Sequence, residues 1–157
     1  QTFDPNANQY AFRNRDELLP FSNSANVNVA QYVRTIDYQT TFPMVLQKYM
    51  DLKGIKKHTS LCKAIGMKPD TFSSLLCGKY RAVKKDNVLR LCVGLHLSVS
   101  EAEELLNSAG FMLSNAIMTD VVIKAFLWNR IYGVVAINME LEENNAPMLF
   151  HDYEIDC

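Results

Sequence analysis

The residues with the clearest chemical potential are basic side chains gathered in one block of the sequence. Residues 53–90 contain ten Lys and Arg against two acids, Asp70 and Asp86, so this block has a net charge of +8. Neutralisation of phosphates by Lys and Arg dominates the affinity of proteins for nucleic acids. The block therefore predicts a polyanionic partner, and a basic face that is merely solvated is the alternative.

The rest of the chain has the opposite balance. Residues 1–52 carry four basic and five acidic side chains, net −1, and residues 91–157 carry two basic and ten acidic ones, net −8, which leaves the chain at −1. The acidic part could repel nucleic acid, pair with the basic block within the molecule, or be unrelated to both.

Residue types that serve catalysis or metal binding are present, but not in suitable patterns. The chain lacks a glycine-rich phosphate loop, a nucleophile elbow and an H-E-x-x-H motif. The cysteines form no C-x-x-C pair and the histidines do not cluster with them: Cys62, Cys77, Cys92 and Cys157, and His58, His96 and His151. We therefore predict no enzyme, no metal site and no cofactor. Acids near the end of the chain are expected to be solvated rather than to hold a cation: Glu142, Glu143, Asp152, Glu154 and Asp156.

A stretch of the basic block, residues 59–76 (TSLCKAIGMKPDTFSSLL), has the spacing of a helix-turn-helix. Gly66 suits a left-handed turn that other residues enter only at a cost. Cys62 is small enough for two helices to cross closely there. Pro69 fits the first position of a second helix, where its missing N–H costs nothing. The side chains expected to fill the space behind that helix have helical spacing: Met67, Phe72 and Leu75.

This layout, together with the link at 78–81 and the apolar helix pattern after it, resembles the lambda-repressor type of helix-turn-helix domain, also called the Cro/C1 or XRE type. The resemblance covers roughly residues 40–97. It implies an all-α, lambda-repressor-like bundle from a bacterium or phage that binds double-stranded DNA to regulate transcription. Residues 105–114 and 119–126 are similar to bacterial proteins in which such a domain continues into further helices.

The resemblance also implies which side chains would face the bases. They lie at the start and on the outward side of the second helix of the motif, which enters the major groove: Lys68, Asp70, Thr71, Ser73 and Ser74. Pro69 stands where the family often has a polar reader. No Gln, Asn or Arg is present among them to make bidentate base contacts, each worth roughly 1–3 kcal/mol. We therefore expect DNA binding without strong sequence preference.

Phosphate contacts are better supplied in the same family layout. Lys57, His58 and Thr59 precede or open the first helix of the motif, where free N–H groups and the helix dipole favour a phosphate. The link and the start of the next helix supply a second group: Lys79, Tyr80, Arg81, Lys84 and Lys85. For Tyr80, packing within the domain is an equally good interpretation.

Apolar spacing and capping residues predict helices through most of the chain after residue 39. The expected helices lie at about 40–52, 59–65, 69–77, 84–95, 98–108, from 119 to a break at 132–133, and 134–143. Ser98 and Glu101 form a capping-box pattern, and Thr119 is expected to cap the helix that follows it.

Residues 1–39 are rich in Asn, Gln and Ser and show no helical period, which predicts an extended N-terminal arm. Its aromatic residues would anchor it to this domain or to a partner, or belong to a linker: Phe3, Tyr10, Phe12 and Phe21. Residues 27–32 (VNVAQY) alternate apolar and polar side chains and predict a short strand.

The predicted organisation is an arm or linker at 1–39, a helix-turn-helix domain at 40–97, a helical extension packed on it at 98–146 and a loose acidic tail at 147–157. We predict a cytoplasmic, DNA-binding transcription regulator that forms a homodimer through its C-terminal helices. No apolar run reaches the roughly 18 residues of a membrane span, so no membrane partner is expected. The alternative is a non-catalytic interaction or regulatory module with the same fold, part of a larger protein, whose arm reaches a protein partner.

Overall fold

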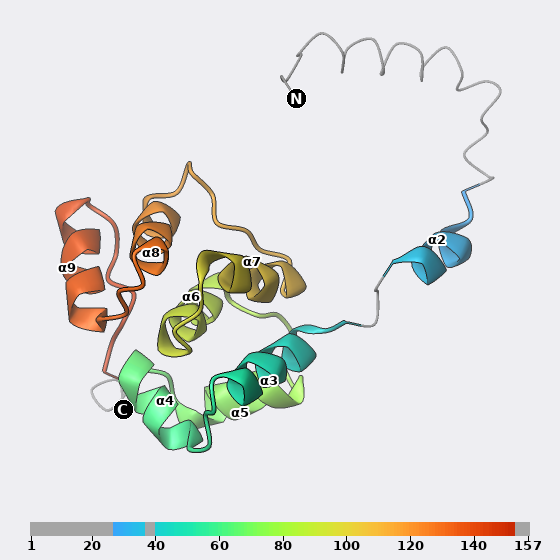
Figure 1. Cartoon of the computed structure of the whole chain (residues 1–157), viewed down its shortest axis with the longest axis horizontal. Coiled ribbons are helices and arrows are strands. Elements are labelled where there is room, and N and C mark those ends of the chain that lie inside the picture. The colour runs from blue at the N-terminus through green and yellow to red at the C-terminus, as the bar shows by residue number, and fades with distance from the viewer. Residues whose placement is uncertain (1–26, 37–39, 153–157) are drawn as a thin grey trace, which may run out of the picture. The chain divides into compact units, whose positions relative to one another are not determined.

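The computed structural model describes residues 27–36 and 40–152 of the chain. All regular structure in these ranges is helical, so the predicted all-α fold is confirmed (Figure 1). The helices are α2 (Val29–Thr35), α3 (Phe42–Leu52), α4 (His58–Ile65), α5 (Pro69–Cys77), α6 (Lys85–Gly94), α7 (Val99–Ser108), α8 (Met118–Trp128) and α9 (Val134–Glu143). Among these residues, no helix combines the length and the apolar character that crossing a membrane requires. The chain divides into two compact units, 1–38 and 39–157.

In the first unit, the strand predicted at residues 27–32 is wrong, because these residues enter α2. Asn28 caps this helix: its side-chain oxygen accepts a hydrogen bond from the backbone N–H of Gln31 at 3.0 Å. The apolar residues follow a helical period that outweighs the short alternation: Val29, Tyr32, Val33 and Ile36. None of the residues of α2 is buried. The aromatic residues of the predicted arm lie outside the described residues: Phe3, Tyr10, Phe12 and Phe21.

In the second unit, α4 and α5 form the predicted helix-turn-helix. Gly66 adopts the left-handed conformation, with φ 67° and ψ 35°, and the N–H of Met67 bonds the carbonyl of Cys62 at 2.9 Å. Pro69 is the first residue of α5. The apolar residues expected behind α5 are buried: Met67, Phe72 and Leu75.

Helix α6 packs against α4 and against α7. Half of its residues are buried: Val88, Leu89, Leu91, Cys92 and Val93. Helices α4 and α6 approach closely at Gly94, where a Cβ would lie 2.6 Å from Ile65 Cγ2 and 2.7 Å from Leu61 Cδ1. Cys62 is fully buried on α4, as expected for a helix crossing. Gly94 is a second small residue at this crossing, in addition to the predicted Cys62.

The remaining helices continue from the domain in order, with α7 against α3 and α6, α8 against α7, and α9 against α8 (Figure 1). The capping box of α7 is confirmed, because Ser98 Oγ accepts from the N–H of Glu101 at 3.2 Å and Glu101 Oε1 accepts from the N–H of Ser98 at 2.9 Å. The predicted cap at Thr119 is wrong. The N-cap residue of α8 is Ile117, because Asp120 in the first turn accepts from the N–H of Ser114 at 2.8 Å and fixes the entry of the chain.

After α9 the chain forms a strap, residues 146–151, that runs back along α9 toward α4 (Figure 1). Leu149 and Phe150 are buried in the core. The side chain of Asn138 accepts from the N–H groups of Leu149 and Phe150, each at 3.1 Å, and donates to the carbonyl of Phe150 at 2.8 Å. The prediction of a loose acidic tail from residue 147 is therefore wrong for this part, because two apolar side chains anchor it.

Candidate nucleic-acid interface

Helix α5 divides into a buried face and an outward face. Phe72 and Leu75 point into the core, with 1% and 4% of their surface exposed. On the remaining sides lie the five predicted base-reading residues. Lys68, Asp70 and Ser73 are exposed, and Thr71 and Ser74 are half-buried. The structure thus places all five on or next to one helix, with Lys68 as its N-cap residue.

A groove of about 680 Å³ lies between the start of α5 and the start of α6. It brings together Lys68 and Thr71 with Lys84, which the sequence analysis had assigned to base and phosphate contacts respectively. It also contains four polar residues that were not predicted as site residues: Asp86, Asn87, Arg90 and His151. We call this feature the α5–α6 groove.

Arg90 forms a fixed positive wall of the α5–α6 groove. Its Nε donates to the carbonyl of Leu149 at 2.7 Å, and a terminal nitrogen donates to Asn87 Oδ1 at 2.7 Å. Burial lowers the pKa of Arg90, and the nearby carboxylate of Asp86 opposes this shift. A guanidinium stays protonated at any physiological pH, so this charge is permanent and held in place.

Lys85 differs from its neighbour Lys84 in having an internal partner. Its ammonium lies 2.5 Å from Asp120 Oδ2, and the side chain of Asp120 is only 2% exposed. Releasing Lys85 to a phosphate would leave a carboxylate buried without its counter-ion, which is strongly unfavourable. The structure therefore gives Lys85 a role in joining α6 to α8, whereas Lys84 is exposed.

The start of α4 offers a second group of predicted phosphate contacts. Lys57 is the N-cap residue and has no side-chain capping bond, and His58 and Thr59 are exposed in the first turn. The His58 ring meets the Phe72 ring edge-on, with centroids 5.1 Å apart, and this contact ties the start of α4 to α5. Unbonded N–H groups and the positive end of a helix dipole favour an anion here.

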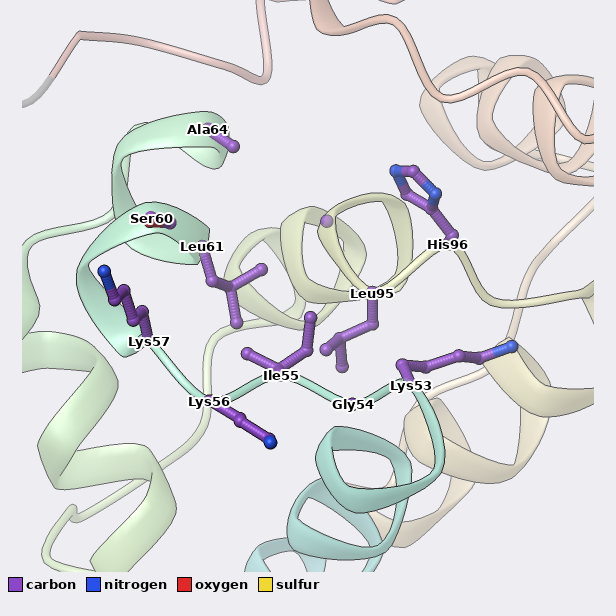
Figure 2. A pocket seen from close by; sticks show the side chains of 11 residues that line it. Lys53, Gly54, Ile55, Lys56, Lys57, Ser60, Leu61, Ala64, Leu95 and His96 are labelled. Atoms are coloured by element: carbon purple, nitrogen blue, oxygen red, sulfur yellow. The ribbon is translucent and has the colours of Figure 1, made fainter.

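Beside the start of α4 lies a pocket of about 450 Å³, shown in Figure 2. Its floor is apolar, with Ile55, Leu61 and Leu95 meeting at the centre, and Lys56 and Lys57 stand at one rim. Lys53, at the other side, points away toward α7, where its ammonium lies 3.1 Å from Glu101. Lys56 and Lys57 therefore add positive charge beside the start of α4, whereas Lys53 does not.

The link after α5 supplies the remaining predicted contacts. Gly78 ends α5 in the left-handed conformation, and Lys79 and Arg81 after it are exposed. Tyr80 is half-buried, with its ring edge-on to that of Phe42 at 6.4 Å, and burial raises its pKa. The packing interpretation of Tyr80 is therefore the one that the geometry favours.

Cysteine and histidine side chains are spread over the molecule. Cys62 and Cys92 are buried, Cys77 is exposed, and all three are free thiols. His96 stacks on Tyr132 with centroids 4.4 Å apart. Within residues 27–36 and 40–152, no group of three or more His, Cys, Asp or Glu side chains is arranged to hold a metal ion.

A family model described as the Cro/C1-type HTH DNA-binding domain matches residues 45–106. The match begins within α3 and ends within α7, so it contains the whole helix-turn-helix and all of α6. No curated protein and no solved structure matches the chain. The predicted resemblance is thus confirmed: this part of the chain is a lambda-repressor-like, Cro/C1-type helix-turn-helix domain, and further helices follow it.

Proposed function

We propose that this Cro/C1-type domain makes the chain a cytoplasmic, bacterial transcription regulator that inserts α5 into the major groove of DNA. The side chains offered to base edges are Lys68, Asp70, Thr71, Ser73 and Ser74. Three are exposed and two half-buried on or beside one helix, which is what a recognition helix requires. Because hydroxyl groups and one carboxylate dominate this set, sequence preference rests on few contacts.

Affinity comes mainly from phosphates held on the two sides of α5. One group is Lys57, His58 and Thr59 at the start of α4. The other is Lys79, Arg81 and Lys84, and the ring of Tyr80 in the same link packs against Phe42. The main support for the proposal is that few cations of residues 53–90 form ion pairs within the molecule. Among the described residues, the ion pairs of this block engage only Lys53 and Lys85.

The regulator acts as a homodimer that joins through its C-terminal helices. A single module makes few contacts, and dimers of this class bind two half-sites. Support comes from exposed apolar side chains on α8 and α9, among them Val121, Trp128, Val135 and Met139. An apolar groove of about 330 Å³ between these two helices adds to this surface.

The rival function, a protein-interaction module, is favoured by α2. Its apolar stripe of Val29, Tyr32 and Ile36 is exposed by 43% to 64%, and a helix of this length does not persist alone in water. A protein partner for the N-terminal part of the chain is compatible with DNA binding. It replaces DNA binding only if duplex affinity is absent.

Fluorescence anisotropy with a random-sequence duplex at two salt concentrations tests the proposal without knowledge of the operator. We expect log K to fall with log salt at a slope of about −0.9 for each phosphate neutralised. Thr71→Ala and Ser74→Ala should change the preference among sequences by roughly 1–3 kcal/mol where the contact is a good one. Absence of duplex binding at about 50 mM salt contradicts the proposal and supports the interaction module.

A further inference from the structure

The guanidinium of Arg90 is held in the α5–α6 groove by bonds from two distant parts of the chain. Its Nε donates to the carbonyl of Leu149 in the strap, and a terminal nitrogen donates to Asn87 Oδ1, each at 2.7 Å. The strap lies outside residues 45–106, which the family model matches. The part of the chain after the helix-turn-helix domain therefore sets the position of a cation on that domain.

The strap residue that accepts from Arg90 is itself fixed. The N–H of Leu149 donates to Asn138 Oδ1 of α9 at 3.1 Å, and the side chain of Leu149 is buried. Two residues later, the carbonyl oxygen of His151 lies so close to Gly66 that a Cβ on this glycine would be 1.5 Å from it. The guanidinium is thus preorganised beside the turn of the motif, which reduces the entropy lost when it binds an anion.

The α5–α6 groove has a surplus of positive charge. The Lys, Arg and Asp side chains that line it are Lys68, Lys84, Lys85, Asp86 and Arg90. Lys85 is paired with the buried Asp120. The other three cations form no ion pair within residues 27–36 and 40–152. They face a single carboxylate of the groove, that of Asp86, so the groove attracts anions.

The position of the groove beside α5 indicates which anion it receives. The major groove of DNA admits an α-helix, so a sugar-phosphate backbone runs along each side of a helix bound there. The α5–α6 groove opens beside the start of α5, at Lys68 and Thr71. Its volume of about 680 Å³ lies in the range of sites that hold whole small molecules, so a phosphate with its adjoining sugars fits.

We propose that Arg90 is a further ligand of DNA and binds a backbone phosphate in the α5–α6 groove, between Lys68 and Lys84. A guanidinium has more N–H donors than the two that Leu149 and Asn87 occupy, and it meets phosphate oxygens in a planar fork that Lys cannot form. This inference rests on the proposed function and extends the phosphate contacts assigned there. Through the strap, the part of the chain after the domain contributes to DNA binding as well as to dimer formation.

The test compares variants of the full chain in anisotropy titrations with a random duplex over a range of salt concentrations. Arg90→Gln removes the charge, whereas Arg90→Lys keeps the charge and loses the planar fork. Arg130→Gln is the matched control, because Arg130 is an exposed residue just after α8 and does not line the groove.

We expect Arg90→Gln to bind about tenfold less tightly than the native chain at about 50 mM salt, with a salt slope that is shallower by about 0.9, the value for one phosphate. Arg90→Lys should keep the native slope and lose only about threefold in affinity, since its charge remains. Arg130→Gln should stay within about twofold of the native chain, with an unaltered slope.

A role of Arg90 in packing alone would give a different result. The Gln and Lys variants would then lose affinity equally and keep the native salt slope, and this outcome overturns the inference while the proposed function stands. An equal change of slope in Arg90→Gln and Arg130→Gln overturns it as well. Absence of duplex binding by the native chain overturns both the inference and the proposed function.

A second measurement uses the native chain, so it does not depend on the folding of a variant. In NMR spectra of arginine Nε–H groups, the signal of Arg90 should shift when the duplex is added, and the signal of Arg130 should stay in place. Inorganic phosphate at the same ionic strength should shift the Arg90 signal much less, because it lacks the other contacts of the duplex. No shift with the duplex, or an equal shift with inorganic phosphate, overturns the inference, and the second result would identify a site for a free phosphate compound.

Discussion

The helix-turn-helix part of the molecule, residues 40–97, and the part that follows it, residues 98–152, present different surfaces. The first carries the +8 block and exposes only two large apolar side chains, Met44 and Leu52. The second is acidic and exposes nine of them: Met112, Ile117, Met118, Val121, Trp128, Ile131, Val135, Met139 and Met148. One surface suits a polyanion, and the other suits an apolar partner.

The two parts nevertheless share one core. Lys85 of α6 pairs with the buried Asp120 of α8, and Arg90 of α6 bonds the strap. On the other side, Tyr49 of α3 donates to Glu104 of α7 at 2.7 Å. The two parts therefore differ in charge but are packed together as one core. The strap of the second part also lies against Gly66, in the turn of the helix-turn-helix.

The largest loss of stability is expected from truncating a buried side chain of the strap. Phe150→Ala removes a side chain that is 6% exposed in the core, so it should lower the free energy of unfolding by about 3–5 kcal/mol. Met148→Ala is the matched control, because Met148 is 53% exposed and should change stability by less than about 0.5 kcal/mol. Urea denaturation measures both. Equal midpoints would show that the strap is not part of the core.

A smaller effect is expected at the turn itself. Gly66→Ala should cost about 2–5 kcal/mol, because the left-handed conformation and the clash with the His151 carbonyl both oppose a Cβ. Gly54 has nearly the same φ, 69°, and nothing within 4 Å of its added Cβ, so Gly54→Ala should cost only about 1–2 kcal/mol. The difference between the two thermal unfolding curves measures the contact of the strap with the motif. Identical losses would remove this contact from the account.

The crossing of helices within the motif is tested at Cys62. Cys62→Leu should overpack the fully buried site and cost about 1–3 kcal/mol, whereas Cys62→Ala should be nearly silent. Denaturant titration of both variants decides this. The same denaturation midpoint for the Leu and Ala variants would show that a larger side chain fits at position 62, contrary to the complete burial of Cys62.

The smallest effect concerns the polar contacts between α3 and α7. The N–H of Ser98, and then the ammonium of Lys53, lower the pKa of Glu101 below its ordinary value of 4.5. Hydrogen bonds from Lys48 and Tyr49 lower the pKa of Glu104 in the same way. A carboxyl group with a lowered folded pKa stabilises the protein above its unfolded pKa, and this stabilisation is lost as pH falls through the folded pKa.

We therefore expect the free energy of unfolding to decrease as pH falls below about 4.5, by less than about 1 kcal/mol for each group, since both are partly exposed. Glu101→Gln with Glu104→Gln should reduce this dependence, and denaturation at about pH 6 and pH 3 measures it. An unchanged pH dependence in the double variant would exclude these two groups as its source.

Much of the helix-turn-helix could be predicted because its signals are local. Gly66, Pro69 and the capping box of Ser98 each act within a few residues, and the structure has all three as expected. The error at residues 27–32 is of the same kind, since an Asn cap and a helical period compete there with a short alternation. The sequence pattern was correct about apolar spacing, but the wrong period was chosen.

The remaining features depend on residues far apart in the chain. Asp120 is 35 residues from Lys85, and Leu149 is 59 residues from Arg90, so no spacing rule connects them. The strap residues Leu149 and Phe150 form too short an apolar run to show a period. The α5–α6 groove could be anticipated at Lys68, Thr71 and Lys84, but Arg90 and His151 enter it only through the tertiary fold.

The central claim is that DNA phosphates bind the helix-turn-helix part and not the part that follows. Paired charge reversals test it most directly: Lys79→Glu with Lys84→Glu in the first part, and Lys124→Glu with Arg130→Glu in the second. The two pairs change the net charge by the same amount, and Lys85 is left in its ion pair with Asp120. In anisotropy titrations with a random duplex at about 50 mM salt, the first pair should weaken binding to every sequence and flatten the salt slope by about two phosphates, or 1.8 in log–log terms. The second pair should change affinity much less and leave the slope unaltered. Equal losses from the two pairs, or a larger loss from the second, would contradict the account.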